Sequence, residues 1–520
     1  MSNATPEKAS LRDWLAVAAA ILGAFTAILD IQITNSSLAD IQGALGASSE
    51  EGSWISTAYL MAEIIVIPLT GWLGSIFGLR RYLAANTVLF IGFSIACALS
   101  SSLTEMIFFR AGQGFTGGVL IPTAITIVRT RLPKSQQGVG IALFGLTATF
   151  APAIGPTVGG WLTDNLSWHY IFYLNLVPGP IALALQLYVL DKAPMRLEEL
   201  GKGDWLGIGL MVLGLPALTF VLEEGQRKDW FDSPVIVQVT WLAIFGIVGF
   251  IVRELTTAKP FINLRVLKSR SVGGGCLLMT VLGAVSFGSI YVIPVYCAQI
   301  QGYNAEQIGY VVMWSGLPQL VMFPAMPYFM KRFDARLLVA IGTLLFAASC
   351  FMNVNLTHDV GMDQLIVPQL LRATGQPLFA VPLSQLSTAG LPPRDTADAS
   401  ALSNMMRNLG GSVGIAMLST MIERREHFHF SVLAEAITQN AVLTQQRLGA
   451  MIASIQAHMV DPIAARGEAL SLLATQVRRE AYVMAYSDAF WIIGVGLIIS
   501  LAAITLLRQP ERTARPIEAH

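Results

Sequence analysis

The chain has 520 residues, of which 54% are hydrophobic and only 13% are charged. Soluble globular proteins carry about 25% charged residues, so this composition leaves too little polar surface for a soluble protein of this length. The 33 basic and 33 acidic residues cancel, which argues against a nucleic-acid partner because such partners select a basic surface. The composition therefore predicts a protein embedded in a lipid bilayer.

Long apolar runs with few charges recur along the whole chain. A helix needs about 20 such residues to cross roughly 30 Å of hydrocarbon, and a helix satisfies its own backbone where no water is available. The sequence therefore predicts an all-α membrane protein with fourteen transmembrane helices. The expected spans are 14–36, 53–74, 82–101, 104–129, 138–163, 169–190, 205–222, 235–252, 271–300, 307–330, 337–355, 364–388, 398–421 and 483–507.

Basic residues are unevenly distributed among the segments that join these spans. With the N-terminus inside, the predicted cytoplasmic segments hold 22 of the 33 basic residues, the short outer loops hold two and a long outer segment holds six. The remaining three, Arg110, Arg372 and Arg407, lie inside spans. Because loops rich in Lys and Arg stay on the cytoplasmic side, we expect both termini in the cytoplasm.

Part of the chain repeats itself. Arg110-Ala-Gly-Gln-Gly in one span and Arg372-Ala-Thr-Gly-Gln in another lie 262 positions apart, and similar Leu-Pro sequences begin the loops that follow them. Two parallel repeats with the substrate path between them are one way in which secondary transporters are built. The predicted organisation is a cytoplasmic N-terminus 1–13, a six-helix half 14–190, an inserted helix pair with its loops 191–270, a second six-helix half 271–507 and a cytoplasmic tail 508–520.

The second half includes a long outer segment, residues 422–480. Leu448, Met451, Ile452 and Ile455 recur at helical spacing, so the segment is expected to form amphipathic helices. Two interpretations remain open for it. The helices lie on the membrane surface or cap the outer mouth, or they dock a periplasmic partner.

Ionisable residues inside the spans are the first candidates for a functional site, because charges are costly in hydrocarbon. Asp30 lies six residues before the outer end of its span, and Arg110 lies six residues after the outer start of its own. At about 1.5 Å per residue both fall roughly 9 Å below the outer interface, where they could meet. The pair either exchanges a proton during transport or forms a permanent structural bond. Glu63 is a second candidate, as a protonation site, as a counter-charge for cationic substrates, or as a neutral carboxyl bonded to a neighbouring helix.

Glycine and proline are concentrated in the fifth span. Gly155 and Gly159 have the GxxxG spacing that permits close contact with a facing helix. Pro152 and Pro156 each remove a helix hydrogen bond and favour a bend. A bent, tightly packed span would suit a seal that closes one side of the membrane, and close packing alone is the other interpretation.

These motifs resemble the major facilitator superfamily and, within it, the fourteen-spanner drug:proton antiporters of the EmrB type. The resemblance covers nearly the whole chain and rests on six motifs in the expected order. They are the LDxTIxN-like sequence 29–35, the loop motif 71–81, Arg110, Gln113 and Gly114 of RxxQG, the antiporter motif 151–160 with Pro152, Gly155, Pro156, Gly159 and Gly160, the WxxIFxxNxPxG-like sequence 168–179, and the late signature 407–414.

The resemblance implies a major facilitator fold that exports hydrophobic or amphiphilic compounds by proton antiport across the bacterial inner membrane. It also implies a periplasmic adapter and an outer-membrane channel as partners. No cofactor is expected apart from the proton gradient, because the chain has no GxxxxGK[ST] phosphate loop. The alternatives are a nutrient importer of the same fold and a membrane enzyme or sensor. A catalytic enzyme would need a His or Cys constellation, and the four cysteines are scattered in apolar runs.

Overall fold

The computed structural model describes residues 8–507, apart from 258–259, 261, 389–390, 392, 439–440 and 459–460. The described part of the chain consists of helices, short 3-10 turns and loops, with no strand, which confirms the predicted all-α class. The predicted tail 508–520 and residues 1–7 of the predicted N-terminal segment lie outside the described residues.

The first half is a bundle built around α1 and α6. Ser10 caps the start of α1 through a reciprocal capping box with Asp13, so the first span begins close to its predicted start. Span 4 is divided into two helices at Gly118, and span 6 contains a 3-10 turn. The helices are α1 (Leu11–Ser36), α2 (Leu38–Ala44), α3 (Ser49–Gly52), α4 (Trp54–Phe77), α5 (Leu79–Ala98), α6 (Leu103–Gly117), α7 (Leu120–Arg131), α8 (Lys134–Asn165), α9 (His169–Tyr173) and α10 (Pro178–Val189).

The inserted pair consists of α11 (Trp205–Glu224) and α12 (Pro234–Thr256). These helices approach so closely that a Cβ on Gly214 would lie 2.6 Å from the Ile247 backbone nitrogen. α11 also packs on α4 of the first half and on α18 of the second, through a core that all three helices share. The pair therefore covers a seam between the two halves.

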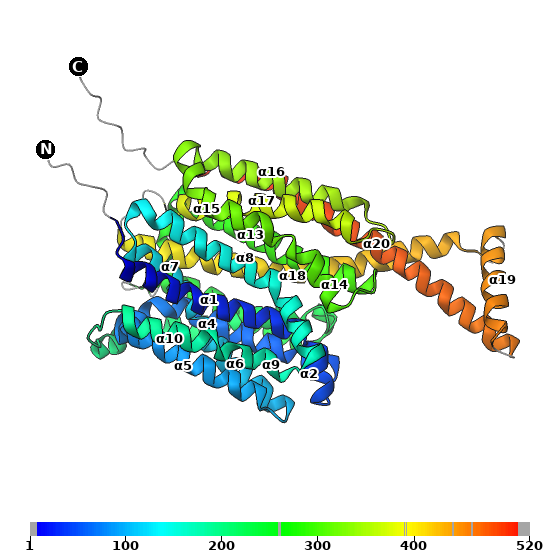
Figure 1. Cartoon of the computed structure of the whole chain (residues 1–520), viewed down its shortest axis with the longest axis horizontal. Helices are drawn as coiled ribbons and strands as arrows, with labels where there is room; N and C mark the ends of the chain where they lie inside the picture. Colours follow the sequence, from blue (N-terminus) through cyan, green and yellow to red (C-terminus); the bar gives the residue numbers. More distant parts are fainter. Residues whose placement is uncertain are drawn as a thin grey trace, which may run out of the picture.

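The second half continues with long helices, and Figure 1 shows it lying beside the first half. Its core joins α13, α16, α17 and α20. Span 10 is divided near Trp314 into two helices. The helices are α13 (Arg270–Gln299), α14 (Ala305–Met313), α15 (Gly316–Arg332), α16 (Ala335–Met352), α17 (Met362–Leu386), α18 (Pro393–Ala436), α19 (Val442–Gln456) and α20 (Pro462–Ile504).

The described part of residues 422–480, which we call the arm, projects beyond the bundle (Figure 1). The arm contains the end of α18, all of α19 and the beginning of α20, so the last spans run directly into it. Leu448, Met451, Ile452 and Ile455 are half-buried, and α19 packs along α20. The predicted amphipathic face is therefore present, in an arm built from extended spans rather than in separate helices lying along the bundle.

Among the described residues, twelve helices or helix pairs are long and apolar enough to cross a membrane. They coincide with twelve of the fourteen expected spans. The two other expected spans, 364–388 and 398–421, correspond to α17 and α18, which lie within the bundle (Figure 1) but are not among the twelve. The count of fourteen is compatible with the structure and remains a prediction.

Candidate functional site

Asp30 lies in the interior of the first half with only 2% of its surface exposed. Its Oδ2 atom accepts a hydrogen bond of 2.6 Å from Arg110 Nη1. Its Oδ1 atom accepts two more, at 2.8 Å from Gln113 Nε2 and at 2.6 Å from Asn175 Nδ2. The structure thus brings together Asp30 and Arg110, the two residues that their predicted depths had placed at one level.

Arg110 is equally enclosed, with 1% of its surface exposed. Besides the bond to Asp30, its Nη1 donates to Gln113 Oε1 at 2.7 Å, and its Nε donates to the Ile55 carbonyl at 3.3 Å. The guanidinium carbon lies 4.4 Å from the centre of the Tyr59 ring, which adds a cation–π contact. The charge is thus compensated by a carboxylate, two carbonyl oxygens and an aromatic face.

Sequence reasoning did not select Asn175 as a site residue, although it lies in the WxxIFxxNxPxG-like sequence. In the structure Asn175 joins Asp30 to Ser94, because its Nδ2 also donates to Ser94 Oγ at 2.8 Å. The signal was available as a polar residue in an apolar span. What the sequence could not give is the direction of the side chain, which the 3-10 turn Leu174–Leu176 sets.

Close packing of α6 on α4 explains why the RxxQG motif has a glycine at position 114. A Cβ at this position would lie 2.2 Å from the Tyr59 carbonyl oxygen, so α6 can approach α4 this closely only with glycine. The approach also brings Tyr59 over the Arg110 guanidinium. Gly114 therefore contributes to the site by packing, whereas Gln113 contributes by hydrogen bonding.

Glu63, the second candidate, is 7% exposed on α4. No hydrogen bond or ion pair joins its carboxyl group to another described residue. Two cations act on it electrostatically, Arg407 from α18 and Arg110 from α6. Since α4 contacts α18, Glu63 lies where the two halves meet and is separate from the Asp30 network.

The other two intramembrane arginines belong to the second half and are less well compensated. Arg372 Nε donates to Gln369 Oε1 at 2.9 Å, the one hydrogen bond that this side chain makes within the described residues. Arg407 Nε is buried without a hydrogen-bond partner among them. Within the part of the chain that the structure describes, neither arginine forms an ion pair such as that of Arg110 and Asp30.

The glycines of span 5 pack against α1 of the same half. A Cβ on Gly155 would lie 2.5 Å from Gln32 Cβ, and a Cβ on Gly159 would lie 3.0 Å from the Ile33 carbonyl oxygen. α8 continues through both prolines, and Pro152 and Gly160 are buried while Pro156 is half-buried. The helix that faces these glycines thus belongs to the same half, and a sealing role for span 5 stays a prediction.

Contact between the halves comes from other faces of α8. A Cβ on Gly309 of α14 would lie 1.9 Å from Thr157 Oγ1, and a Cβ on Gly145 would lie 2.2 Å from Phe323 Cε1 of α15. α8 therefore touches the second half at two levels, while its glycine face holds it against α1. Close packing of Gly155 and Gly159 fixes the position from which Thr157 reaches α14.

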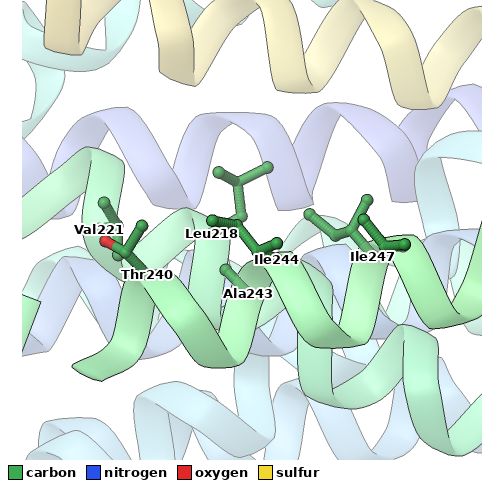
Figure 2. Close-up of a pocket in the computed structure, with 7 residues that line it drawn as sticks. Leu218, Val221, Thr240, Ala243, Ile244 and Ile247 are labelled. Carbon is green, nitrogen blue, oxygen red and sulfur yellow. The ribbon is translucent and has the colours of Figure 1, made fainter. Parts of the chain in front are cut away.

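Two apolar hollows lie outside the polar network. One, of about 340 Å³, lies between α1 and α8 and is lined by residues that include Trp14, Phe25 and Leu143. The other, of about 190 Å³, is a groove between α11 and α12 (Figure 2). Thr240 alone among its lining residues has a polar side-chain atom. The first hollow borders the helix that carries Asp30, whereas none of the candidate site residues lines the second.

Comparison with known proteins agrees with this architecture. Residues 20–415 match the family model of the Major Facilitator Superfamily. The chain is 32% identical over 490 residues to the colistin resistance protein EmrB of Acinetobacter baumannii, covering 94% of each chain. It is 31% identical over 494 residues to the multidrug export protein EmrB of Escherichia coli, again covering 94% of each.

Solved structures agree at the level of the fold. A peptide transporter, POT, determined in complex with sulfate, superimposes with a TM-score of 0.58 at 14% identity and covers 95% of both chains. At this identity the likeness concerns the fold alone. The predicted major facilitator fold and the predicted resemblance to EmrB-type proteins are both confirmed.

Proposed function

This chain belongs to the major facilitator superfamily, and we propose that it exports hydrophobic and amphiphilic compounds across the inner membrane in exchange for protons. Its similarity along 94% of its length to a multidrug export protein and to a colistin resistance protein supports the export of such compounds. The observation that carries proton coupling is the enclosed bond between Asp30 and Arg110. The Asp30 carboxylate can be ionised or protonated, whereas the Arg110 guanidinium stays charged, so the pair has two charge states.

Coupling follows from the hydrogen bonds of Asp30. An ionised carboxylate only accepts hydrogen bonds, and both oxygens of Asp30 are occupied by donors. Protonation removes the negative charge of Asp30, and the bond to Arg110 weakens because it no longer joins two ions. The helices α1 and α6 that carry the pair are then free to separate. Each proton that enters down a membrane potential supplies about 2.3 kcal/mol per 100 mV, which is enough to bias such a rearrangement.

Glu63 acts at the next step, where the halves meet. It has no fixed partner, and it attracts Arg407 across the seam between α4 and α18. When Glu63 is ionised this attraction holds the halves together, and when it is neutral or binds a cationic substrate the attraction is lost. Asp30 thus controls the interior of one half, while Glu63 controls the contact between halves.

The test is a pair of variants. Asp30→Asn keeps the shape of the side chain but cannot ionise, so proton-driven uptake of a fluorescent lipophile into inverted vesicles should vanish while its binding persists. The double variant Asp30→Asn/Arg110→Gln removes both charges and leaves no unpaired arginine. If the pair is only structural, the double variant regains pH-driven transport, and that result would refute coupling through Asp30.

The arm supports a proposal about assembly. Asp488 Oδ2 accepts bonds from Arg425 Nε at 2.6 Å and pairs with His429 Nε2 at 2.7 Å, so α18 and α20 are tied together where the arm leaves the bundle. With both termini in the cytoplasm the arm extends into the periplasm, where an adapter protein connected to an outer-membrane channel can reach it. No residue of α19 is fully buried, and the face of α19 that does not pack on α20 is exposed.

Deletion of residues 430–478 tests this role and keeps Arg425, His429 and Asp488 in place. Substrate–proton exchange in liposomes should remain near the wild-type rate, because the deleted residues lie outside the Asp30 network. Resistance of cells that express the variant should be lost. Loss of exchange in liposomes as well would make the arm part of the transport core.

A reporter fused near Leu448 should report the outside, and one after Arg81 the cytoplasm.

A further inference from the structure

Arg110 and Arg372 occupy related positions in the two halves. Each is buried on a helix that packs against a neighbouring helix with a buried cysteine, Cys97 on α5 for Arg110 and Cys350 on α16 for Arg372. Each cysteine lies within electrostatic range of its arginine. The two arginines that the sequence repeat relates therefore also have similar surroundings, each buried beside a cysteine of the neighbouring helix.

The carboxylate is the part that the second half lacks. Asp30 belongs to α1, and its counterpart helix α13 begins 259 positions later, at Arg270 instead of Leu11. That shift places Ser289 at the level of Asp30, with Ser286 one turn earlier on the same face. Both serine hydroxyls are buried and have no hydrogen-bond partner among the described residues.

The surroundings of Arg372 contain further unused polar atoms. Gln369, Arg372 and Gln376 recur at spacing i, i+3, i+7 and form a polar stripe along α17. Gln319 of α15 meets this stripe, where its Nε2 donates to Gln376 Oε1 at 3.1 Å. Gln369 is 1% exposed, and its Nε2 donor has no partner among the described residues.

The charge of Arg372 is consequently uncompensated by the described chain. Arginine stays protonated at any accessible pH, and an unpaired charge in a membrane interior is costly. Among the described residues, the neutral thiol of Cys350 is the one ionisable group with an electrostatic effect on Arg372, whereas Arg407 has Glu63 and Arg110 has Asp30. An arginine with free donors, next to an unused amide donor, is matched by a carboxylate, which accepts two parallel bonds from a guanidinium.

We propose that Arg372, with the polar stripe of α17, binds the carboxylate of amphiphilic acids that the protein exports. This inference rests on the proposed export function and assigns the side chains that recognise the acidic group of such substrates. The ligand supplies to the second half the negative charge that Asp30 supplies to the first. The carboxylate gives the site its preference over alcohols and amines of equal length.

Binding to the purified full-length protein in nanodiscs tests the inference with three twelve-carbon probes: laurate, dodecanol and dodecyltrimethylammonium. The wild type should bind laurate at least about tenfold more tightly than dodecanol, which is the effect of one charge-assisted hydrogen bond. Arg372→Gln should remove this preference, and Arg372→Lys should restore part of it. Arg332 is the control, because it lies on the surface of the same half and donates to Tyr328 Oη. The Arg332→Gln variant should bind all three probes as the wild type does.

Three results overturn the proposal. They are equal affinities of the wild type for laurate and dodecanol, an undiminished laurate preference in Arg372→Gln, and competition by acetate as strong as that by laurate, which would indicate a site for small anions. A parallel assay of pH-driven transport of a permanently cationic dye by the wild type separates this inference from the proposed function. Dye transport without a laurate preference rejects the carboxylate site alone, whereas absence of dye transport and of all probe binding rejects both.

Discussion

The two halves of the bundle differ in how each treats its buried arginine. In the first half Arg110 donates from Nη1 to Asp30 and Gln113 and from Nε to a backbone carbonyl. In the second half Arg372 has a single bond to Gln369. The two halves therefore share the buried cation, but among the described residues only the first supplies an anion to it. The comparison indicates that the first half holds an internal switch, while the second half leaves a place for a ligand.

The largest expected effect comes from removing each arginine in turn. Arg110→Gln leaves Asp30 buried without its cation, and breaking a buried pair in this way costs about 3–5 kcal/mol. Arg372→Gln removes a charge that no described carboxylate compensates, so stability should stay equal or rise. Thermal unfolding of the detergent-solubilised variants measures both. Equal losses of stability in the two variants would show that Arg372 has a compensating partner and would contradict the difference between the halves.

An intermediate effect is expected from the packing that holds the first site together. Gly114→Ala places a methyl group 2.2 Å from the Tyr59 carbonyl oxygen, and such overpacking costs about 1–3 kcal/mol. Gly92→Ala is the matched control in the same half, because nothing lies within 4 Å of its new Cβ. The unfolding midpoint should fall for Gly114→Ala and hold or rise for Gly92→Ala. A neutral Gly114→Ala would mean that the α4–α6 contact is not tight.

The smallest effect concerns Asp191, an exposed carboxylate that joins Arg12 of α1 to Arg131 of α7. The bond and charge of Arg131 hold the pKa of Asp191 below its usual range, and Arg12 adds to this. The stabilisation is therefore complete above the unfolded pKa and is lost as the pH falls through the lowered value. Asp191→Asn should lower the unfolding midpoint slightly at neutral pH and low salt. The difference should disappear in acid and at high salt, and a difference that persists there would point to a role other than charge.

Much of the molecule follows from the sequence because the bilayer restricts the possibilities. Apolar runs did not predict the division of span 4 at Gly118 or the turn before α10. The hydropathy of a run reflects how many apolar residues it contains and does not detect a local change of helix direction. Asp30 and Arg110 were predictable as a pair because both are charges at one depth in a medium that penalises charge. Asn175 was not, because a neutral amide carries a weaker signal and its relevance depends on a turn.

The sequence by itself determined the helical class, the family resemblance, and the charges that must be compensated inside the membrane. It also determined that Gly155 and Gly159 form a close contact, because only small residues at that spacing allow it. Only the tertiary structure decided which helix meets that face, and it is α1 of the same half. Likewise only the structure shows that Arg110 is compensated and Arg372 is not, because compensation depends on atoms brought together from helices far apart in the chain.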